Sequence, residues 1–240
     1  MNVEIPIDIC PICAQEAVPF IVAGREMSLC KGCGHKFVTQ WDIDYTRRGI
    51  SAWRENCFSQ NIKNIDDGFE WNSFVQSRME KLFSHRINIA GAKVLSLCEI
   101  GCMEGTVLYR AKKMGHNVIG FEITEDVAML RDFIQPLPIT DYQGGETFDA
   151  VFSFHVYEHL FDVAETTNKI MECLKPAGRI FIEVPFDDKD YWNPDHLHFY
   201  TWNSLDALFK NYTDVIKTLS SYIDSKKGEC KLIQISGRKP

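Results

Sequence analysis

The sequence lacks any apolar run that approaches the roughly 18 residues needed to cross a membrane as a helix. Residues 1–9 have neither the basic start nor the apolar centre of a secretory signal. Cations are also scarce, because 26 Lys and Arg residues face 33 Asp and Glu residues, which gives a formal net charge of −7. This balance gives no general electrostatic reason to bind nucleic acid. We therefore expect a cytoplasmic protein that binds neither membrane nor nucleic acid.

Internal repeats and low-complexity stretches are absent too. The chain has 240 residues, of which 45% are hydrophobic and 25% charged, an ordinary balance for a protein that buries a core. This length predicts one globular domain with a small appendage. We divide the chain into an N-terminal module at 1–40, a helical linker at 41–92 and a core at 93–240.

Cysteine is plentiful, and four of the nine cysteines form two C-x2-C pairs, Cys10 with Cys13 and Cys30 with Cys33. Each pair places two thiolates on one tight turn, and two such turns complete a tetrahedral zinc site. Without a secretory signal, the cysteines indicate a reducing compartment rather than a disulfide framework. We predict a zinc ribbon in which the four cysteines fill the site and His35 lies outside it.

The core opens with a strand, a glycine-containing turn and a helix. An apolar run ends at Glu99, and Gly101 and Gly105 bracket the turn that follows. The next apolar run ends at Glu122, where an acid can accept hydrogen bonds from both hydroxyls of a ribose. The G-x-G-x-x-G pattern of dinucleotide sites is missing. Glu99 and Glu104 would repel a pyrophosphate but suit a ligand with an ammonium and a sulfonium group, so we predict S-adenosylmethionine as the ligand.

This acid-x-Gly-x-x-x-Gly turn resembles the cofactor motif of class I S-adenosylmethionine-dependent methyltransferases. Four later segments resemble that family in the family's order: the fourth strand at 147–153, the Glu-His segment at 155–160, the "LKPGG-strand-VP" signature at 174–185 with Ala177 in place of its first glycine, and a His-Leu-His-Phe segment at 195–205. The resemblance implies an α/β fold, a Rossmann-like sheet with helices on both faces, preceded here by the zinc ribbon.

The resemblance also implies roles for single residues. Glu122 would hold the ribose, Ile123 would pack on the adenine, and Asp141, after a third strand predicted at 137–140, would bind the adenine amino group. The methionine end of the cofactor would meet four residues of the first turn: Glu99, Gly101, Cys102 and Gly105. An amphipathic helix predicted over 69–89 either closes over the cofactor as a lid or packs on the sheet edge.

The expected chemistry is direct displacement at the sulfonium methyl, for which the enzyme aligns the acceptor and excludes water. A hydroxyl or carbon acceptor also needs a base, and a histidine oriented by a carboxylate is suitable. The candidates follow the fourth and fifth strands: His155, Tyr157, Glu158, His159, His196 and His198. The H-x-x-E-H order of zinc peptidases also occurs here, but that pattern requires a helix. A metal ion shared by Glu158 and the three later histidines is a further hypothesis.

Two groups of methyltransferases share a four-cysteine ribbon with this chain. In bacterial sugar and natural-product methyltransferases, a tyrosine, a glutamate and a histidine assist deprotonation, and Tyr157, Glu158 and His159 resemble them. We do not expect the C-terminal domain of the sugar C-methyltransferases, which puts sugar C-methylation itself in doubt. In ribosomal-RNA guanine methyltransferases the ribbon holds RNA, which needs cations that acids oppose in this ribbon. We therefore expect a small-molecule or glycan acceptor. An RNA acceptor and a non-catalytic cofactor-binding scaffold are the alternatives.

Overall fold

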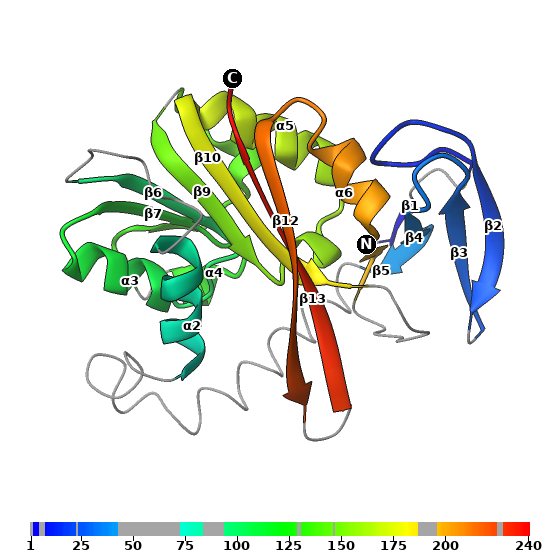
Figure 1. The fold of residues 1–240 in the computed structure, drawn as a ribbon, viewed down its shortest axis with the longest axis horizontal. Helices are drawn as coiled ribbons and strands as arrows, with labels where there is room; N and C mark the ends of the chain where they lie inside the picture. The colour runs from blue at the N-terminus through cyan, green and yellow to red at the C-terminus, as the bar shows by residue number, and fades with distance from the viewer. Residues whose placement is uncertain are drawn as a thin grey trace.

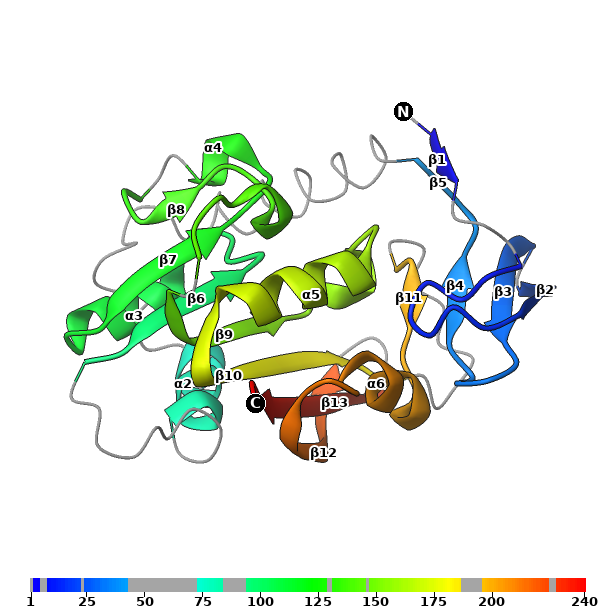
Figure 2. The ribbon, with the colours of Figure 1, turned by 90° about the horizontal axis from the view of Figure 1, so that it is seen from above.

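The computed structural model describes residues 2–4, 8–22, 24–42, 73–83, 94–128, 131–145, 147–186, 196–224 and 228–240. A large twisted sheet with helices on both faces forms one part of the molecule, and a small sheet lies at one end of it (Figures 1 and 2). No helix in these described ranges is long and apolar enough to cross a membrane.

Seven strands form the large sheet: β6 (Ser96–Ile100), β7 (Asn117–Phe121), β8 (Ile134–Gln135), β9 (Phe148–Phe154), β10 (Leu174–Pro185), β12 (Thr213–Asp224) and β13 (Gly228–Arg238). Their order is β12-β13-β10-β9-β6-β7-β8. Strand β6 pairs in parallel with both β7 and β9, whereas β13 runs antiparallel to β10 and β12. The strand order reverses between β6 and β9, and open α/β sheets bind ligands at such a switch point. The predicted Rossmann-like fold is confirmed.

Helices cover both faces of this sheet: α2 (Ser73–Lys81), α3 (Thr106–Lys113), α4 (Glu125–Ala128), α5 (Val163–Cys173) and α6 (Trp202–Leu208). Ile180 of β10 packs in the cluster that contains α5 and α6, while its neighbour Phe181 packs in the cluster that contains α2 and α3. Successive side chains of a strand point to opposite faces. Strands covered on both faces therefore read as nearly continuous apolar runs, which is why the sequence located them.

Helix α3 starts directly after Gly105 and buries Val107, Leu108 and Ala111. The helix ends at Lys113, and its C-cap, Met114, is 53% exposed because it no longer follows the helical repeat.

The third strand was also predicted at the wrong place. It is β8, and the predicted segment 137–140 instead enters the 3-10 turn η3 (Ile139–Asp141). Pro136 and Pro138 have no backbone N–H to donate to a neighbouring strand, so the ladder ends before them.

Of the helix predicted over 69–89, the described residues contain α2 and the two residues after it. Met79 and Leu82 are buried in the same cluster as Leu108 of α3. This burial favours packing on the sheet over a freely closing lid.

The small sheet has the order β11-β4-β3-β2, with β2 (Ala17–Val22), β3 (Arg25–Cys30), β4 (Lys36–Val38) and β11 (His198–Phe199). A separate pair joins β1 (Asn2–Glu4) to β5 (Gln40–Asp42). Strand β11 belongs to the segment between β10 and α6, far along the chain from the other three. The core thus contributes one strand to the N-terminal sheet, beside α6 (Figure 2).

Candidate functional site

The turn after β6 requires glycine at two positions. Gly101 and Gly105 have φ of +63° and +68°, a region that side-chain-bearing residues rarely adopt. A Cβ on Gly101 would lie 2.3 Å from a methyl carbon of Val156, and one on Gly105 would lie 2.9 Å from Ile134 Cδ1. Both positions combine a special backbone conformation with close packing, so the turn is shaped by the chain itself.

Glu122 fastens this turn to the end of β7. One carboxylate oxygen accepts the backbone N–H of Met103 at 3.0 Å, and the other accepts that of Thr124 at 2.9 Å. Each carboxylate oxygen has a further lone pair, so the group can still accept two ligand hydroxyls. Ile123 beside it is 56% exposed and presents an apolar surface.

Glu99, at the end of β6, is buried and incompletely bonded. Its Oε2 accepts no hydrogen bond from any residue that the structure describes. Burial raises the pKa of Glu99 to about 8, the charges of Glu104 and Glu122 act in the same direction, and Arg78 opposes them. A buried oxygen without a donor is costly, and a ligand ammonium would supply the missing donor. The turn and its acids therefore fit S-adenosylmethionine.

Two further residues predicted to bind the cofactor, Cys102 and Asp141, differ in exposure. Cys102 is buried, and its sulfur would lie 2.4 Å from a Cβ on Gly120, so the side chain points into the sheet and leaves only the backbone for a ligand. Asp141 lies exposed at the end of η3.

A group of acids and histidines follows β9 at the same edge of the sheet. His155 has φ of +56° and is 30% exposed, with Nδ1 3.4 Å from Glu158 Oε1 and Nε2 3.6 Å from Glu183 Oε1. Val156, the next residue, is the one that packs against Gly101. The group therefore borders the cofactor turn.

Glu158 belongs to the 3-10 turn η4 (Tyr157–His159) and is buried. Burial alone would raise its pKa, but the hydrogen bond with His155 and the nearby His159 and His196 outweigh burial and lower the pKa to about 2. The rings of His159 and His196 meet edge to face, with centroids 5.0 Å apart. The site thus holds an ionised carboxylate among three histidines.

Two candidates from the sequence do not face this site. Tyr157 is fully buried, its hydroxyl contacts Thr167 Oγ1 at 3.4 Å, and burial raises its pKa, so it is a poor proton acceptor. His198 is buried too, and its Nε2–H donates to the carbonyl of Leu160 at 2.8 Å. Its Nδ1 therefore accepts from His35 Nε2 at 3.0 Å. Both side chains are committed to core packing, which speaks against contact of either with the acceptor.

Cations of α2 approach the same edge, which the sequence analysis missed. Lys81 Nζ lies 2.6 Å from Glu183 Oε2, and the guanidinium of Arg78 lies 4.4 Å from the centre of the Phe154 ring. Gln234 donates to the same oxygen of Glu183 at 2.7 Å. The sequence did contain a sign that Glu183 belongs to the site, because Glu183, like Glu99, is an acid near the end of an apolar strand.

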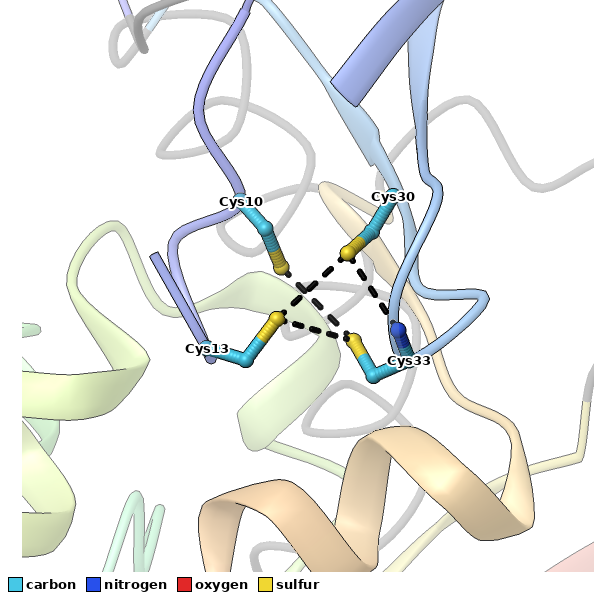
Figure 3. Close-up of side chains that lie close together, drawn as sticks. All are labelled: Cys10, Cys13, Cys30 and Cys33. Atoms are coloured by element: carbon cyan, nitrogen blue, oxygen red, sulfur yellow. Dashed lines mark hydrogen bonds between the residues drawn. The ribbon is translucent and has the colours of Figure 1, made fainter. Parts of the chain in front are cut away.

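The four cysteines of the two C-x2-C pairs converge at the other end of the molecule (Figure 3). Their sulfur atoms are 3.4 to 3.8 Å apart in the three contacts drawn. A tetrahedron with zinc–sulfur bonds of about 2.3 Å has sulfur atoms about 3.8 Å apart. Backbone N–H groups of Ile12 and Cys33 point at the sulfurs of Cys10 and Cys30, both at 3.4 Å. This donor set and spacing fit zinc. His35 is buried beside the cluster and is not one of its ligands.

This fold and this nucleoside-type site define a class I S-adenosylmethionine-dependent methyltransferase. A family model described as "Methyltransferase domain" matches residues 71–213, more than half of the chain, and the chain belongs to this family.

Solved structures have the same fold at low sequence identity. A SAM-dependent methyltransferase from Archaeoglobus fulgidus has a TM-score of 0.59 at 16% identity, covering 69% of this chain and 93% of its own. The 1,6-didemethyltoxoflavin-N1-methyltransferase of Burkholderia thailandensis has a TM-score of 0.55 at 17% identity, covering 92% and 98%.

Curated relatives give a third comparison. A tRNA U34 carboxymethyltransferase of Alteromonas mediterranea is 27% identical over 169 residues, which are 63% of this chain and 49% of the relative. The chain spans about half the length of such relatives.

Proposed function

We propose that this methyltransferase acts on a small-molecule or sugar-type acceptor, at the edge of the sheet where β6 and β9 end. The observation that carries the proposal is the buried Glu99 carboxyl with an open oxygen, set beside two glycines of positive φ and the ribose-type acid Glu122. When bound, S-adenosylmethionine supplies an activated methyl group. The residues of the chain then only bind the two substrates, align the acceptor with the methyl group and remove the acceptor proton.

In this proposal Glu122 accepts the ribose hydroxyls, and Ile123 packs on the adenine. Glu99 accepts a hydrogen bond from the ammonium group at the methionine end of the ligand. This positive charge favours the ionised form of Glu99, which burial alone disfavours. The backbone of the turn from Gly101 through Cys102 to Gly105 borders that end of the ligand. Asp141 is the proposed partner of the adenine amino group.

His155 is the proposed proton acceptor. It is partly exposed, and the carboxylates of Glu158 and Glu183, 3.4 and 3.6 Å from its ring nitrogens, orient it. As the acceptor oxygen forms its bond to the methyl carbon, the carbon–sulfur bond breaks, the bonding pair stays on sulfur, and the acceptor proton moves to His155.

A small, uncharged acceptor suits this surface better than a polyanion does. Glu158 is buried and ionised at this edge, Lys81 is already paired with Glu183, and the chain carries a net charge of −7. A polyanion would therefore need a separate cationic surface to hold its phosphates. RNA is the second candidate, favoured by the 27% identity to a protein named as a tRNA carboxymethyltransferase.

We also propose that Cys10, Cys13, Cys30 and Cys33 bind one structural zinc ion, supported by the sulfur spacing and the two N–H contacts. The cluster packs against the core, since Cys10 and Cys33 share a buried cluster with Leu205 of α6. Zinc would therefore hold the ribbon in place against the core.

The test starts with calorimetric titration of the full chain with S-adenosylhomocysteine, with NAD as the control. Binding of the first ligand alone supports the cofactor site, and absence of both contradicts it. Labelled methyl donor is then offered with neutral glycosides, small phenols and bulk tRNA in parallel. Label in a small acceptor supports the proposal, and label in tRNA alone replaces it with the second candidate.

A further inference from the structure

Apart from the four thiols, a second group of metal-ligating side chains comes together among the described residues. Glu158, His159 and His196 each offer one ligand atom, and these atoms lie within 4.8 Å of one another. They come from two separate segments, η4 and the residues that lead into β11. The backbone joins these segments, because the N–H of Leu197 donates to the carbonyl of Glu158 at 2.7 Å.

Glu158 has one carboxylate oxygen engaged and one open. Oε1 lies 3.4 Å from His155 Nδ1, while Oε2 is buried and accepts no hydrogen bond within the part of the chain that the structure describes. A buried carboxylate oxygen without a partner is costly, because it has lost its hydrogen bonds to water and gained none in return. An ion bound at Oε2 removes that cost, and both imidazoles stand beside it.

We propose that Glu158 Oε2, His159 and His196 bind a divalent transition-metal ion, separate from the ribbon zinc, which holds the hydroxyl of the methyl acceptor. Two imidazoles and one carboxylate suit zinc, iron or cobalt, whereas magnesium and calcium prefer oxygen ligands alone. Three protein ligands leave at least one position for a substrate oxygen. His155 contacts the other oxygen, Oε1, of the ligating carboxylate, as residues around metal sites commonly do.

The position of this cluster suits such a role. Val156 packs against Gly101, so η4 stands next to the turn that faces the cofactor. A metal-bound hydroxyl loses its proton more readily, because the ion stabilises the resulting oxyanion. The proton passes to His155, the oxygen forms its bond to the methyl carbon, and the carbon–sulfur bonding pair remains on sulfur. This use of the ion rests on the proposed function, whereas the binding site rests on the cluster alone.

Cobalt titration of the full, zinc-loaded chain tests the site. We expect uptake of one further Co2+ per chain, with the weak visible absorption of nitrogen and oxygen ligands and without the intense near-ultraviolet bands of thiolate ligands. His159→Gln should weaken this uptake by more than about tenfold, because loss of even an outer-shell partner costs about 10- to 100-fold in metal affinity. The matched control is His116→Gln, since His116 Nδ1 accepts the N–H of Leu95, at the end of β6 opposite to the cofactor turn.

Titration with S-adenosylhomocysteine accompanies each variant and shows that the fold and cofactor site persist. Equal cobalt uptake by the wild type and His159→Gln, thiolate-type bands, or no uptake beyond the ribbon zinc would each overturn the metal site. If S-adenosylhomocysteine binds while cobalt does not, only the metal site fails. If cobalt binds at this cluster while S-adenosylhomocysteine does not, only the proposed function fails.

Discussion

The cofactor turn and the cysteine cluster reach defined shapes by different means. The turn between Gly101 and Gly105 is fixed by its backbone conformation, by packing on Val156 and by the Met103 N–H, which donates to the Glu122 carboxylate. The cysteine cluster has four thiols at the separations of a zinc tetrahedron. Its sheet is completed by β11 from the core. The turn is thus shaped by the chain alone, whereas the ribbon, in our proposal, also relies on a zinc ion and takes one strand from the core.

This difference implies that the two regions respond to different perturbations. Changes at the thiols should act on the ribbon and on what it positions, while cofactor affinity stays nearly constant. Changes at Glu122 or Glu99 should weaken cofactor binding and leave the ribbon nearly unchanged. One connection between the two regions is the contact of His35 with His198, whose segment also carries His196.

The largest effect should follow Cys13→Ser. Loss of one thiolate should release the zinc, whose binding stabilises zinc-finger peptides by about 10–16 kcal/mol, and β2, β3 and β4 should lose protection in hydrogen exchange. Affinity for S-adenosylhomocysteine should change by less than roughly 0.5 kcal/mol, because the sites are separate. Cys230→Ser, outside the cluster, is the control. Full exchange protection of the ribbon in a zinc-free Cys13→Ser chain would contradict the proposal.

Glu122→Ala should reverse the pattern. Loss of two charge-assisted hydrogen bonds to the ligand should weaken S-adenosylhomocysteine by roughly 3 kcal/mol or more in calorimetry, while ribbon zinc content stays the same. Glu125→Ala changes an exposed acid three residues later and should bind the ligand as the wild type does. An unchanged affinity in Glu122→Ala would place the ribose elsewhere.

The buried Glu99 predicts a pH dependence of stability. Its pKa rises from 4.5 to about 8 on folding, so between these values the folded chain keeps a proton that the unfolded chain has released. The free energy of unfolding should therefore fall as pH rises from about 4.5 to 8, by roughly 1.4 kcal/mol per pH unit at most. Denaturant unfolding of Glu99→Gln, which cannot ionise, should lack this slope, and an identical slope in both proteins would count against the assignment.

The smallest effect is expected at two alanines with left-handed backbone, Ala177 in the core (φ 61°) and Ala14 in the ribbon (φ 56°). Glycine adopts this conformation without steric cost, so each Ala→Gly change should stabilise its own region by about 1 kcal/mol. Ala177→Gly should raise the denaturant midpoint of the core, whereas Ala14→Gly should mainly raise the chelator concentration that unfolds the ribbon. Ala207→Gly, within α6, should destabilise by a similar amount.

The sequence predicted the parts of this molecule that depend on local chemistry. Apolar runs located β6, β7, β9 and β10, and the glycine spacing located the cofactor turn. The sequence also predicted that the four cysteines of the C-x2-C pairs come together, because this spacing indicates a metal site whatever the rest of the fold is. The misplaced third strand shows the limit of apolar patterning, since two prolines overrode it.

Long-range packing could not be predicted from the same patterns. Nothing in the local sequence indicates that Tyr157 turns into the core, that His198 bonds His35, or that Lys81 pairs with Glu183. These contacts join residues far apart in the chain, and each depends on how α2 and β11 settle against the sheet. The sequence therefore identifies candidate site residues in loops by the chemistry of their side chains, whereas only the structure shows how those side chains are oriented.

The origin of β11 has a consequence for synthesis of the chain. Strands β2, β3 and β4 leave the ribosome early, but the partner of β4 arrives only with His198 and Phe199. Until then β4 presents an open strand edge, which other chains can pair with. The nascent ribbon can gather its cysteines at once, yet its sheet is completed only after most of the catalytic domain has been translated.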